Sequence, residues 1–600
     1  MKDKTDTFGH MLVNDLLPEK HKITGPLSKK SFYKMLDTMS REDPEEYVRI
    51  VPQLKRLGDS LATTEGLSIG LDDIAPNYKD RNDTLAPFIK RFDAAKTDKA
   101  RQDIAEEAQP HMQESAMRHP GSMTMQVRSG ARGKPTQYSA IISSPTYARS
   151  GKGHVEPWLI RKSYSEGLTP ADNWVAGSEA ILNTISSSTS VSEPGELAKL
   201  LVSNMSDIVI TEDDCGTTNG VFVDVLSPSA VDRYLAKDVG GFKHNTLITS
   251  LNQPRLAKVA SRVLVRSPMT CEAGDGVCQK CQGLNEKGSV HDIGTNVGVR
   301  AAQAMAEPLT QFALNAKHGV RTVKDDRIKV KGIQGFRQII ESPQQFFNKA
   351  TLAQINGTVE KISAAPQGGH YVMVAGQQHY VTPNLNVIVK VGAHVQAGDA
   401  LSQGVPKPNE IVQLKGLGAG RQYMVDTLSG LYKDQGRELD QRHFELLAKG
   451  ELNYVKVIKD PSRNFIPGDV VSYNVLRKEL KKGTKVMPLD EADGETLGKA
   501  YFHFYTGTRV TPQIQAYLKQ QKIKEVVIAP RAPEVEFVMK PATRAPLLHP
   551  DWMARLAHRN LKTTIMQATH FGESSDIHGT HPVPGYITGV EFGEGTKGKY

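Results

Sequence analysis

The chain has only four cysteines, and their spacing limits its fold more than any other feature of the sequence. All four lie within 67 consecutive residues, and three of them form the pattern Cys271-x6-Cys278-x2-Cys281. Two cysteines separated by two residues can place both sulfurs on one zinc ion, about 2.3 Å away. The fourth ligand would be Cys215, because no other cysteine is present. Clustering of this kind in a reduced compartment favours a metal over disulfide bonds.

A zinc ion held by four cysteines has no open coordination position, so such a site stabilises structure and does not catalyse. The ordinary alternative is four small buried residues without a metal. The concentration of all the cysteines in one segment favours the zinc interpretation.

Composition places the chain among globular proteins with several domains. Six hundred residues exceed what one hydrophobic core supports, and 38% hydrophobic with 24% charged residues is ordinary for such proteins. The apolar runs are short and no apolar leader opens the chain, so we expect no membrane span and a cytoplasmic location. Lys and Arg exceed Asp and Glu by 75 to 66, which is compatible with a polyanionic partner but also with a mildly basic surface.

Hydrophobic periodicity predicts helices in the first third of the chain. Residues 1–75 and 76–117 have helical spacing, and residues 172–205 are compatible with one long helix. The serine run at 186–190 and the Pro194-Gly195 pair weaken that long helix.

The pattern changes further along the chain. Residues 295–318 again have helical spacing, and Pro308 requires either a kink or a new helix start. Residues 352–404 alternate between apolar and polar positions bounded by Gly and Pro, which predicts a small β-barrel or sandwich. Helices return at 419–450, whereas residues 465–545 combine strands with charged loops and show no motif.

One helical segment carries an unusual polar stripe. A helix that starts at Pro308 would place Gln311, Leu314, Asn315 and His318 on one face, since these are positions i, i+3, i+4 and i+7. Such a stripe is most often a solvated surface. A binding face is the alternative, and the stripe alone does not decide between them.

The segment from Val297 to Gln311 (VGVRAAQAMAEPLTQ) closely resembles the signature that leads into the trigger loop of the largest, β′-type subunit of multisubunit DNA-dependent RNA polymerases. The following Leu314-Asn315 and His318 resemble the archaeal and eukaryotic form of that loop. Upstream, residues 67–74 resemble the family's GxSxGIDD segment, and residues 129–133 match its SGARG block.

Further segments resemble the family in the same order. Residues 165–216 fit the bridge-helix region and end at its first zinc cysteine, and residues 270–283 resemble the other three zinc ligands in order and spacing. Residues 408–443 resemble the late β′ segment PHDIL…YxxQG…DKHIE. Because these motifs are specific and collinear, the chain is identified as a member of the β′ family, corresponding to its carboxy-terminal part.

The resemblance implies a mixed α/β fold of several domains, with a long bridge-type helix, a four-Cys zinc module, a trigger-loop helical hairpin, a small β-barrel or sandwich domain and a helical C-terminal region. The implied divisions are an N-terminal helical region (1–117), an SGARG-containing region (118–164), a bridge-helix-like segment (165–207), a zinc-binding module (208–290), a trigger-loop hairpin (291–343), a small β domain (344–415), a helical docking region (416–464), a variable mixed region (465–545) and a clamp-base-like segment (546–600).

In this family the trigger loop closes on the correct nucleoside triphosphate. The resemblance implies that Gln311 contacts the ribose, that Leu314 stacks on the base and that Asn315 lies near the sugar. His318 would approach the β-phosphate and donate a hydrogen bond or positive charge to the leaving pyrophosphate. Phosphoryl transfer gains mostly from positioning and charge stabilisation, and a closing lid supplies both.

Two further sites are carried over by resemblance. Arg132 matches the family arginine that approaches the triphosphate, and a guanidinium fork suits phosphate oxygens. Ser187 and Ser188 occupy the bridge-helix position nearest the templating base.

The sequence departs from the family pattern in three places. Residues 179–183 stand where the family bridge helix carries Gly-Ala-Arg-Lys-Gly, so the functions of those two cations are not carried over. Ala313, Ala316 and Lys317 replace the usual Thr, Thr and Phe. The metal motif NADFDGD is absent from the 600 residues, and two-metal nucleotidyl transfer needs its carboxylates to hold Mg²⁺. We therefore expect another polypeptide to supply them.

The resemblance further implies a split subunit of a giant-bacteriophage polymerase, located in the infected host cytoplasm or packaged in the virion; split plastid subunits are the alternative origin. The expected partners are β-type subunits, a β′ N-terminal subunit with the Asp triad, template DNA, product RNA, nucleoside triphosphates and a promoter-specificity subunit, with no membrane. The alternative function is a non-catalytic, zinc-stabilised nucleic-acid-binding or assembly protein. Retention of Arg132 and of the 311–318 stripe disfavours that alternative.

Overall fold

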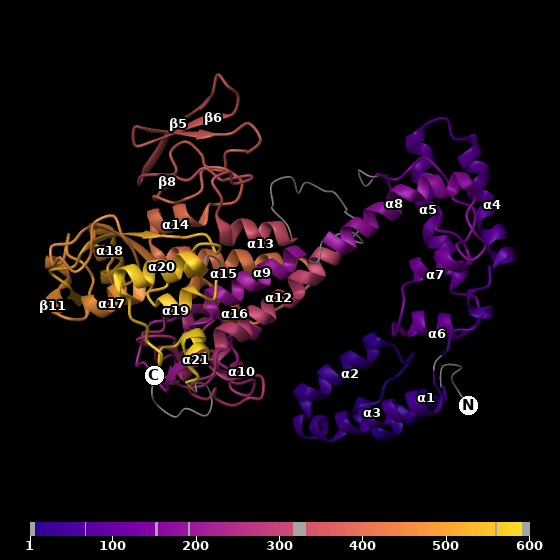
Figure 1. Cartoon of the computed structure of the whole chain (residues 1–600), viewed down its shortest axis with the longest axis horizontal. Coiled ribbons are helices and arrows are strands. Elements are labelled where there is room, and N and C mark those ends of the chain that lie inside the picture. The colour runs from indigo at the N-terminus through magenta and orange to yellow at the C-terminus, as the bar shows by residue number, and fades with distance from the viewer. Residues whose placement is uncertain are drawn as a thin grey trace. The chain divides into compact units, whose positions relative to one another are not determined.

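The computed structural model of the protein describes residues 7–66, 68–150, 154–189, 192–315, 332–558 and 561–590. The chain forms two compact units, Met1–Ser188 and Thr189–Tyr600. Helices dominate, and the second unit adds several small sheets, so the predicted mixed α/β class is confirmed (Figure 1). No helix among the described residues is both long enough and apolar enough to cross a membrane.

The first unit opens with three helices around a small apolar core, as the helical spacing of this segment predicts. These helices are α1 (Phe8–Leu16), α2 (Lys29–Glu42) and α3 (Pro44–Thr64). Ser28 starts α2 through a capping box with Ser31, which satisfies backbone N–H groups that have no partner within the helix. Met39 of α2 and Ile50 of α3 are completely buried in the shared core.

A second helical group completes this unit, consisting of α4 (Tyr78–Ala94), α5 (Asp98–Ala116), α6 (Ser122–Ser129) and α7 (Pro135–Ile142). Helices α4 and α5 pack on each other, with Leu85 and Met112 almost completely buried between them. Arg81 of α4 forms an ion pair with Glu166 that ties the helix to the segment before α8.

Two helices, α8 (Pro170–Thr189) and α9 (Ser192–Met205), stand where the sequence is compatible with one. Residues 190–191 between them lie outside the described residues. Two features of the flanking sequence weaken a continuous helix. Serine hydroxyls compete for helical carbonyls, as Ser188 does by donating to the Thr184 carbonyl (2.7 Å), and Pro194 is suited to the first turn of a new helix.

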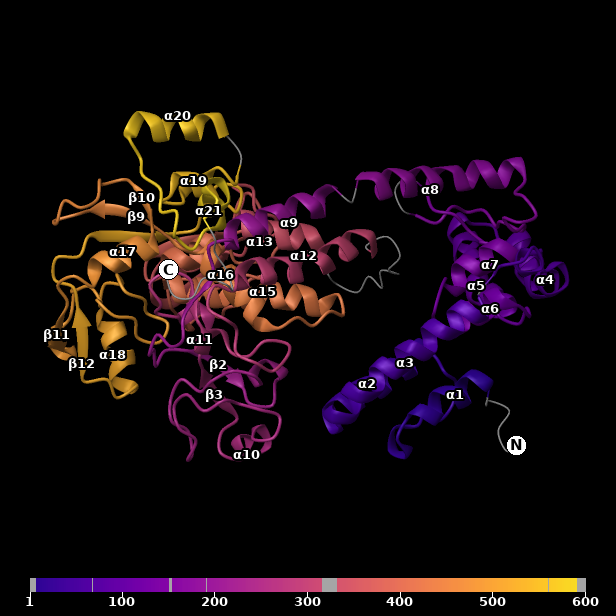
Figure 2. The same cartoon turned by 60° about the horizontal axis from the view of Figure 1, so that its bottom comes forward.

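The central helix of the second unit is α12 (Val297–Asn315), which packs against α9 and α16 (Gln441–Glu451) (Figure 2). The helix passes through Pro308, so a helix start at that residue is excluded. Proline removes one helical hydrogen bond. Complete burial of Met305 and near-complete burial of Leu309, on either side of the proline, offsets that loss through packing.

Close contacts hold the start of α12 against the end of α9. The Asn296 side chain accepts from the Val299 N–H (2.8 Å) and donates to the Ser206 carbonyl (2.7 Å). Gly298 permits this approach, because a Cβ atom there would lie 1.9 Å from the Met205 carbonyl oxygen. The two helix ends are thereby fixed to each other.

The remaining helices of this core pack on α12 or on one another. These helices are α13 (Gly332–Glu341), α14 (Pro408–Lys415) and α15 (Leu417–Asp434). Tyr432 of α15 is almost completely buried, and its hydroxyl donates to the Met305 carbonyl (2.7 Å), which joins α15 to the middle of α12.

A separate antiparallel sheet occupies the region where alternation predicts strands. Its order is β7-β6-β5-β8, formed by β5 (Gly357–Ala364), β6 (His370–Val374), β7 (Gln377–Val381) and β8 (His394–Val395). Alternate residues face its own apolar core, where Val359, Val372 and Val374 are buried. Strands are thus confirmed at 357–362 and 371–374, whereas the third alternating segment, 387–391, has only an isolated bridge at Val387.

The C-terminal part adds two sheets and short helices. In the first sheet, β9 (Tyr454–Lys459) lies between β10 (Val470–Ser472) and β13 (Glu534–Val538). A module with its own core follows α17 (Tyr473–Leu480) and contains β11 (Lys485–Pro488), α18 (Pro512–Gln520) and β12 (Glu525–Ile528). The chain then forms α19 (Trp552–Arg555), α20 (Leu561–Phe571) and α21 (Pro582–Thr588).

The α9–α12 junction gives a first test of the packing. Gly298→Ala should lower stability by about 1–3 kcal/mol, because the added methyl must displace the Met205 carbonyl in a closely packed core. Gly430→Ala is the matched control, since a Cβ there meets nothing within 4 Å and alanine favours a helix interior. Thermal unfolding followed by circular dichroism should show a lower midpoint for the first variant only. Equal midpoints would contradict the close contact.

Candidate functional site

Four short elements bring the cysteines together. Cys215 follows β1 (Ile210–Glu212), and Cys278 ends β4 (Val277–Cys278), which pairs in parallel with β1. Cys271 directly follows a 3-10 turn at Pro268–Thr270, and Cys281 lies in the short helix α11 (Gln279–Gln282). Gly276 makes the turn before β4 with a φ of 65°, where a Cβ would lie 2.1 Å from the Val209 carbonyl oxygen.

The four sulfurs form one compact group. All lie within 4.8 Å of one another, and the Cys215 sulfur is 3.7 Å from those of both Cys271 and Cys281. Four ligands at about 2.3 Å from one zinc ion require a spacing close to this. Three of the cysteines are buried, and Cys215 is half-buried. The four predicted ligands are therefore together and fit a tetrahedral zinc ion.

Backbone and charged groups surround the sulfurs. The Cys278 N–H donates to the Cys271 sulfur (3.3 Å), and the Cys281 N–H donates to the Cys278 sulfur (3.4 Å). The Nη2 of the completely buried Arg266 lies 3.3–3.4 Å from three of the sulfurs. Hydrogen bonds from the other thiols lower the pKa of Cys215. Burial raises the pKa of Cys271 and of Cys281, so Cys215 favours the thiolate form that binds metals, whereas these two thiols would release their protons only on binding the metal.

The Asp214 carboxylate binds Arg266 and the turn that carries Cys215. Its carboxylate accepts from the Gly216 N–H (2.9 Å) and from Arg266 (2.6 Å), and it pairs with Lys280 (3.1 Å). Burial raises the pKa of Asp214, but these donors outweigh it and hold the value at about 2. The carboxylate is therefore ionised at neutral pH. The sequence indicates residues 213–216, which include Asp214, as a turn that can present Cys215, whereas Arg266 carries no spacing signal.

The polar stripe is described only in part. Gln311, Leu314 and Asn315 lie in the last turns of α12, at positions that share one helix face. Their side chains and the whole of His318 lie outside the described residues. The roles predicted for these four residues remain predictions.

The other carried-over positions belong to the first unit. Arg132 is exposed in the turn after α6, and its N–H donates to the Gln126 carbonyl (3.3 Å). Ser187 and Ser188 lie in the last turn of α8, where the Ser188 side chain is exposed. Exposure leaves Arg132 and Ser188 accessible to a ligand. The side chain of Ser187 lies outside the described residues.

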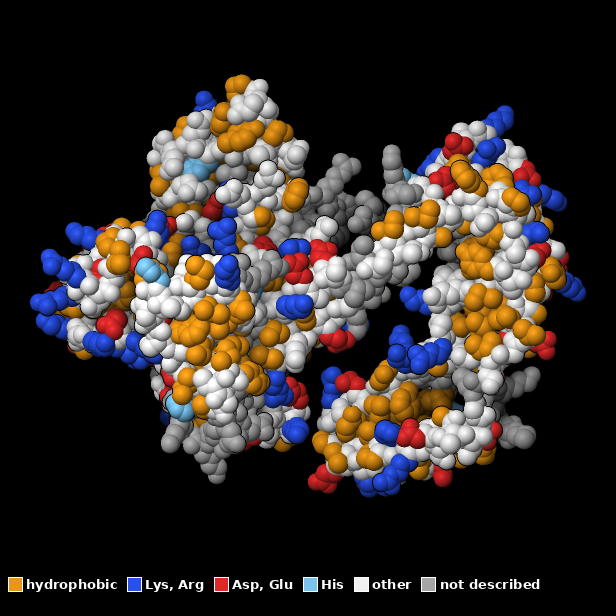
Figure 3. Space-filling model, viewed as in Figure 1, with side chains coloured by type: hydrophobic (Ala, Val, Ile, Leu, Met, Phe, Trp, Pro, Cys, Tyr) orange, Lys and Arg blue, Asp and Glu red, His pale blue; other side chains and the backbone are white. Residues whose placement is uncertain are grey.

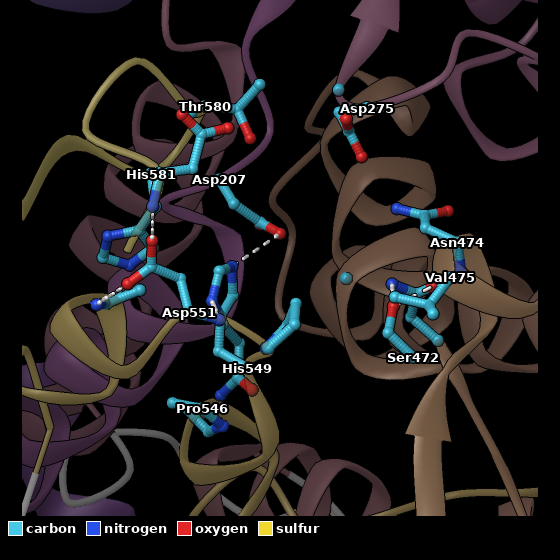
Figure 4. Close-up of a pocket in the computed structure, with 18 of the residues that line it drawn as sticks. Asp207, Asp275, Ser472, Asn474, Val475, Pro546, His549, Asp551, Thr580 and His581 are labelled. Atoms are coloured by element: carbon cyan, nitrogen blue, oxygen red, sulfur yellow. Dashed lines mark hydrogen bonds and ion pairs between the residues drawn. The ribbon is translucent and has the colours of Figure 1, made fainter. Parts of the chain in front are cut away.

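A polar pocket of about 330 Å³ lies at the end of α9, and no sequence motif indicates it. Figure 4 shows His549 reaching toward Asp207, with Asp275 and Asn474 on the opposite wall. The Nε2 atom of His549 is 3.9 Å from an Asp207 carboxylate oxygen, and its Nδ1 accepts from the Asp551 N–H (3.1 Å). These residues come from distant parts of the chain, so spacing could not have predicted the pocket.

His581 closes one side of this pocket as a neutral imidazole. Its Nε2 is bonded to the Ser206 hydroxyl (2.8 Å), and its Nδ1 accepts from the Val583 N–H (3.3 Å). Burial lowers the pKa of His581 to about 3. Protonation of Nδ1 would break this bond, because a protonated Nδ1 can no longer accept from the Val583 N–H.

His581 should therefore make stability depend on pH. Above pH 6.5 both folded and unfolded states hold a neutral imidazole. Between pH 6.5 and 3 only the unfolded state gains the proton, so stability falls on acidification by about 1.4 kcal/mol per pH unit for this group. His581→Gln, which does not titrate, should reduce the loss measured by urea unfolding between pH 7.5 and 5. An unchanged pH dependence would contradict a buried neutral His581.

Comparisons with known proteins agree with this geometry. The family model for RNA polymerase Rpb1, domain 5, matches residues 175–469, which include the four cysteines, α12 and the antiparallel sheet. The β′ subunit of DNA-directed RNA polymerase from Acholeplasma laidlawii is 27% identical over 484 residues. The chain is a relative of the RNA polymerase β′ subunit.

The matches cover much of this chain but less of its relatives. The Acholeplasma match covers 73% of this chain and 35% of that β′ subunit. The β′ subunit of Oceanobacillus iheyensis is 26% identical, covering 73% of this chain and 39% of its own length. The β′ subunit of Nocardioides sp. is 26% identical, and the match covers 78% of this chain and 39% of that subunit. The chain thus spans less than two fifths of these β′ relatives.

Proposed function

We propose that this chain supplies the trigger-loop and bridge-helix part of a DNA-dependent RNA polymerase, and that it takes part in template-directed nucleotidyl transfer from nucleoside triphosphates. The observation that carries the proposal is the match of residues 175–469 to the Rpb1 domain, which contains the whole of α12. The similarity to the β′ subunits of DNA-directed RNA polymerase from Acholeplasma laidlawii and Oceanobacillus iheyensis supports the same function. A bacteriophage origin stays a prediction of the resemblance.

The anchoring of α12 suits the role proposed for its last turns. The helix start is fixed by Asn296 and Gly298, and its middle is fixed by the Tyr432 bond to Met305. A rigid helix whose last turns carry Gln311, Leu314 and Asn315 can position those groups against a nucleotide when the following residues close. In this proposal Arg132 binds the triphosphate, and Ser187 and Ser188 lie near the templating base.

The catalytic Mg²⁺ must be bound elsewhere. The acidic motif NADFDGD does not occur in these 600 residues, so its carboxylates come from sequence outside them. We therefore propose partners that include β-type subunits and the β′ part with the acidic triad, together with DNA and RNA. A basic surface supports binding to nucleic acid. Residues 478–531 contain ten Lys and Arg against six Asp and Glu. In Figure 3, Lys and Arg side chains gather over the end of the molecule that holds β11 and α17.

A second function deserves a test because of the four-cysteine centre. Such a centre would equally suit a non-catalytic, zinc-stabilised assembly protein derived from a polymerase subunit. The two functions differ in one respect: only the polymerase function needs the side chains of the 311–318 stripe. Variants in that stripe therefore separate them.

We propose that Cys215, Cys271, Cys278 and Cys281 hold one structural Zn²⁺. We expect one zinc per chain by elemental analysis of native protein, since the sulfur spacing fits one ion. Removing zinc should unfold the surrounding module, because structural zinc in small domains contributes roughly 10–16 kcal/mol of apparent binding energy. Cys278→Ser should lose most of the metal. Substantially less than one zinc in unoxidised wild-type protein would contradict the site.

His318→Ala gives the most specific test of the catalytic proposal. In the assembled enzyme it should slow nucleotide addition by about 10- to 1000-fold, the range of proton donors and preorganised hydrogen-bond donors. His318→Gln should lose less, because an amide still donates a hydrogen bond. Single-nucleotide addition on preassembled scaffolds measures the step after assembly is complete. Wild-type rates for His318→Ala would favour the assembly function.

A further inference from the structure

A buried guanidinium caps the four-cysteine centre. Arg266 directly follows β3 (Arg262–Val265) and is completely buried. Its Nη2 lies 3.3 Å from the Cys215 sulfur, 3.4 Å from the Cys278 sulfur and 3.3 Å from the Cys281 sulfur. Few side chains are as costly to bury as arginine, so contacts to three sulfurs at once indicate a specific role.

The position of this nitrogen leaves room for a metal. A zinc ion at the centre of the group would lie about 2.3 Å from each sulfur. Nη2 is 3.3–3.4 Å from the sulfurs of Cys215, Cys278 and Cys281, and on the inner side of these three sulfurs it would collide with the fourth, that of Cys271, so it lies on the outer side. The guanidinium and a central metal are therefore compatible.

Two oxygen acceptors aim the guanidinium at the sulfurs. The other terminal nitrogen, Nη1, donates to the Asp214 carboxylate (2.6 Å) and to the Asn245 side-chain oxygen (2.9 Å). Asp214 is itself held by the Asn245 amide (3.1 Å) and by the Gly216 N–H (2.9 Å). With Nη1 engaged, only Nη2 of Arg266 is directed at the cysteines.

Charge explains why a cation belongs here. Four thiolates around one Zn²⁺ leave two negative charges in a buried place, and burying uncompensated charge is unfavourable. We propose that Arg266 is a positioning residue that neutralises part of this charge and determines how tightly the four cysteines hold zinc. This inference rests on the zinc site proposed above. Lysine could supply the charge, but it could not bond the Asp214 carboxylate and three sulfurs in one fixed geometry.

The test uses the full chain loaded with Zn²⁺ or Co²⁺. Arg266→Gln should weaken zinc binding by about 10- to 100-fold in competition with a chelator of known affinity, the usual effect of losing a group that orients metal ligands. Its sulfur-to-cobalt charge-transfer band should move to lower energy, because thiolates without hydrogen bonds hold more electron density. Arg266→Lys should fall between this variant and the wild type in both measurements.

Arg233→Gln is the matched control. Arg233 is as deeply buried as Arg266, but it binds the Glu445 carboxylate through two bonds (3.0 and 2.8 Å). Its loss should lower stability and leave zinc affinity and the cobalt band unchanged. If Arg266→Gln does not fold, Arg266→Lys carries the comparison by itself.

Three results would overturn the inference. The first is wild-type zinc affinity and an unshifted cobalt band in the Arg266 variants. The second is an equal loss in Arg233→Gln, which would reduce the effect to general destabilisation. The third is a wild-type chain that binds neither Zn²⁺ nor Co²⁺, which alone would also remove the proposed zinc site.

Discussion

The second unit depends on the contact between two helix ends that are distant in sequence. The end of α9 at Met205 meets the start of α12 at Val297, and the chain between them returns through the four-cysteine centre. Closing a loop of this length has an entropic cost that local contacts must offset. The Gly298 approach, the Asn296 cap and the sulfur group all act on this one closure. Without it, α12 would have no fixed base.

Buried cations join the cysteine centre to the surrounding helices. Arg421 of α15 donates to the Met269 carbonyl (3.1 Å) and to the Leu452 carbonyl (2.8 Å). Arg477 of α17 donates to the carbonyls of Cys271 and Ala273. These buried carbonyls lie in a 3-10 turn, at the end of α16 and in the loop after Cys271, and bonds to charged donors are stronger than neutral ones. The four-cysteine group and the helical core are thus parts of one packed structure.

The sequence predicts features that follow from periodicity or from rare residues. Cysteine is rare in this chain, so its clustering identified four residues that the structure brings together, and alternation identified the strands of the antiparallel sheet. Pro308 was harder to interpret, because tertiary packing keeps the helix intact through a proline that local rules treat as a kink or a start. The single helix compatible with residues 172–205 appears as α8 and α9.

Features that depend on distant contacts could not be predicted in this way. Arg266 lies outside any motif, and Asp214 gains its bond to Arg266 only from the fold that surrounds the sulfurs. The same holds for the pocket of Asp207 and His549, whose residues are more than 300 positions apart. The roles of Gln311 and His318 come from family resemblance, since their side chains lie outside the described residues.

The most direct test of the account is RNA synthesis by a reconstituted complex. The β-type subunits and the β′ part with the acidic triad would be combined on a primed template, with and without this chain. The account predicts template-dependent RNA only when the chain is present, because it would supply the segment that closes on the nucleotide. Equal RNA synthesis without the chain would contradict a part in nucleotidyl transfer.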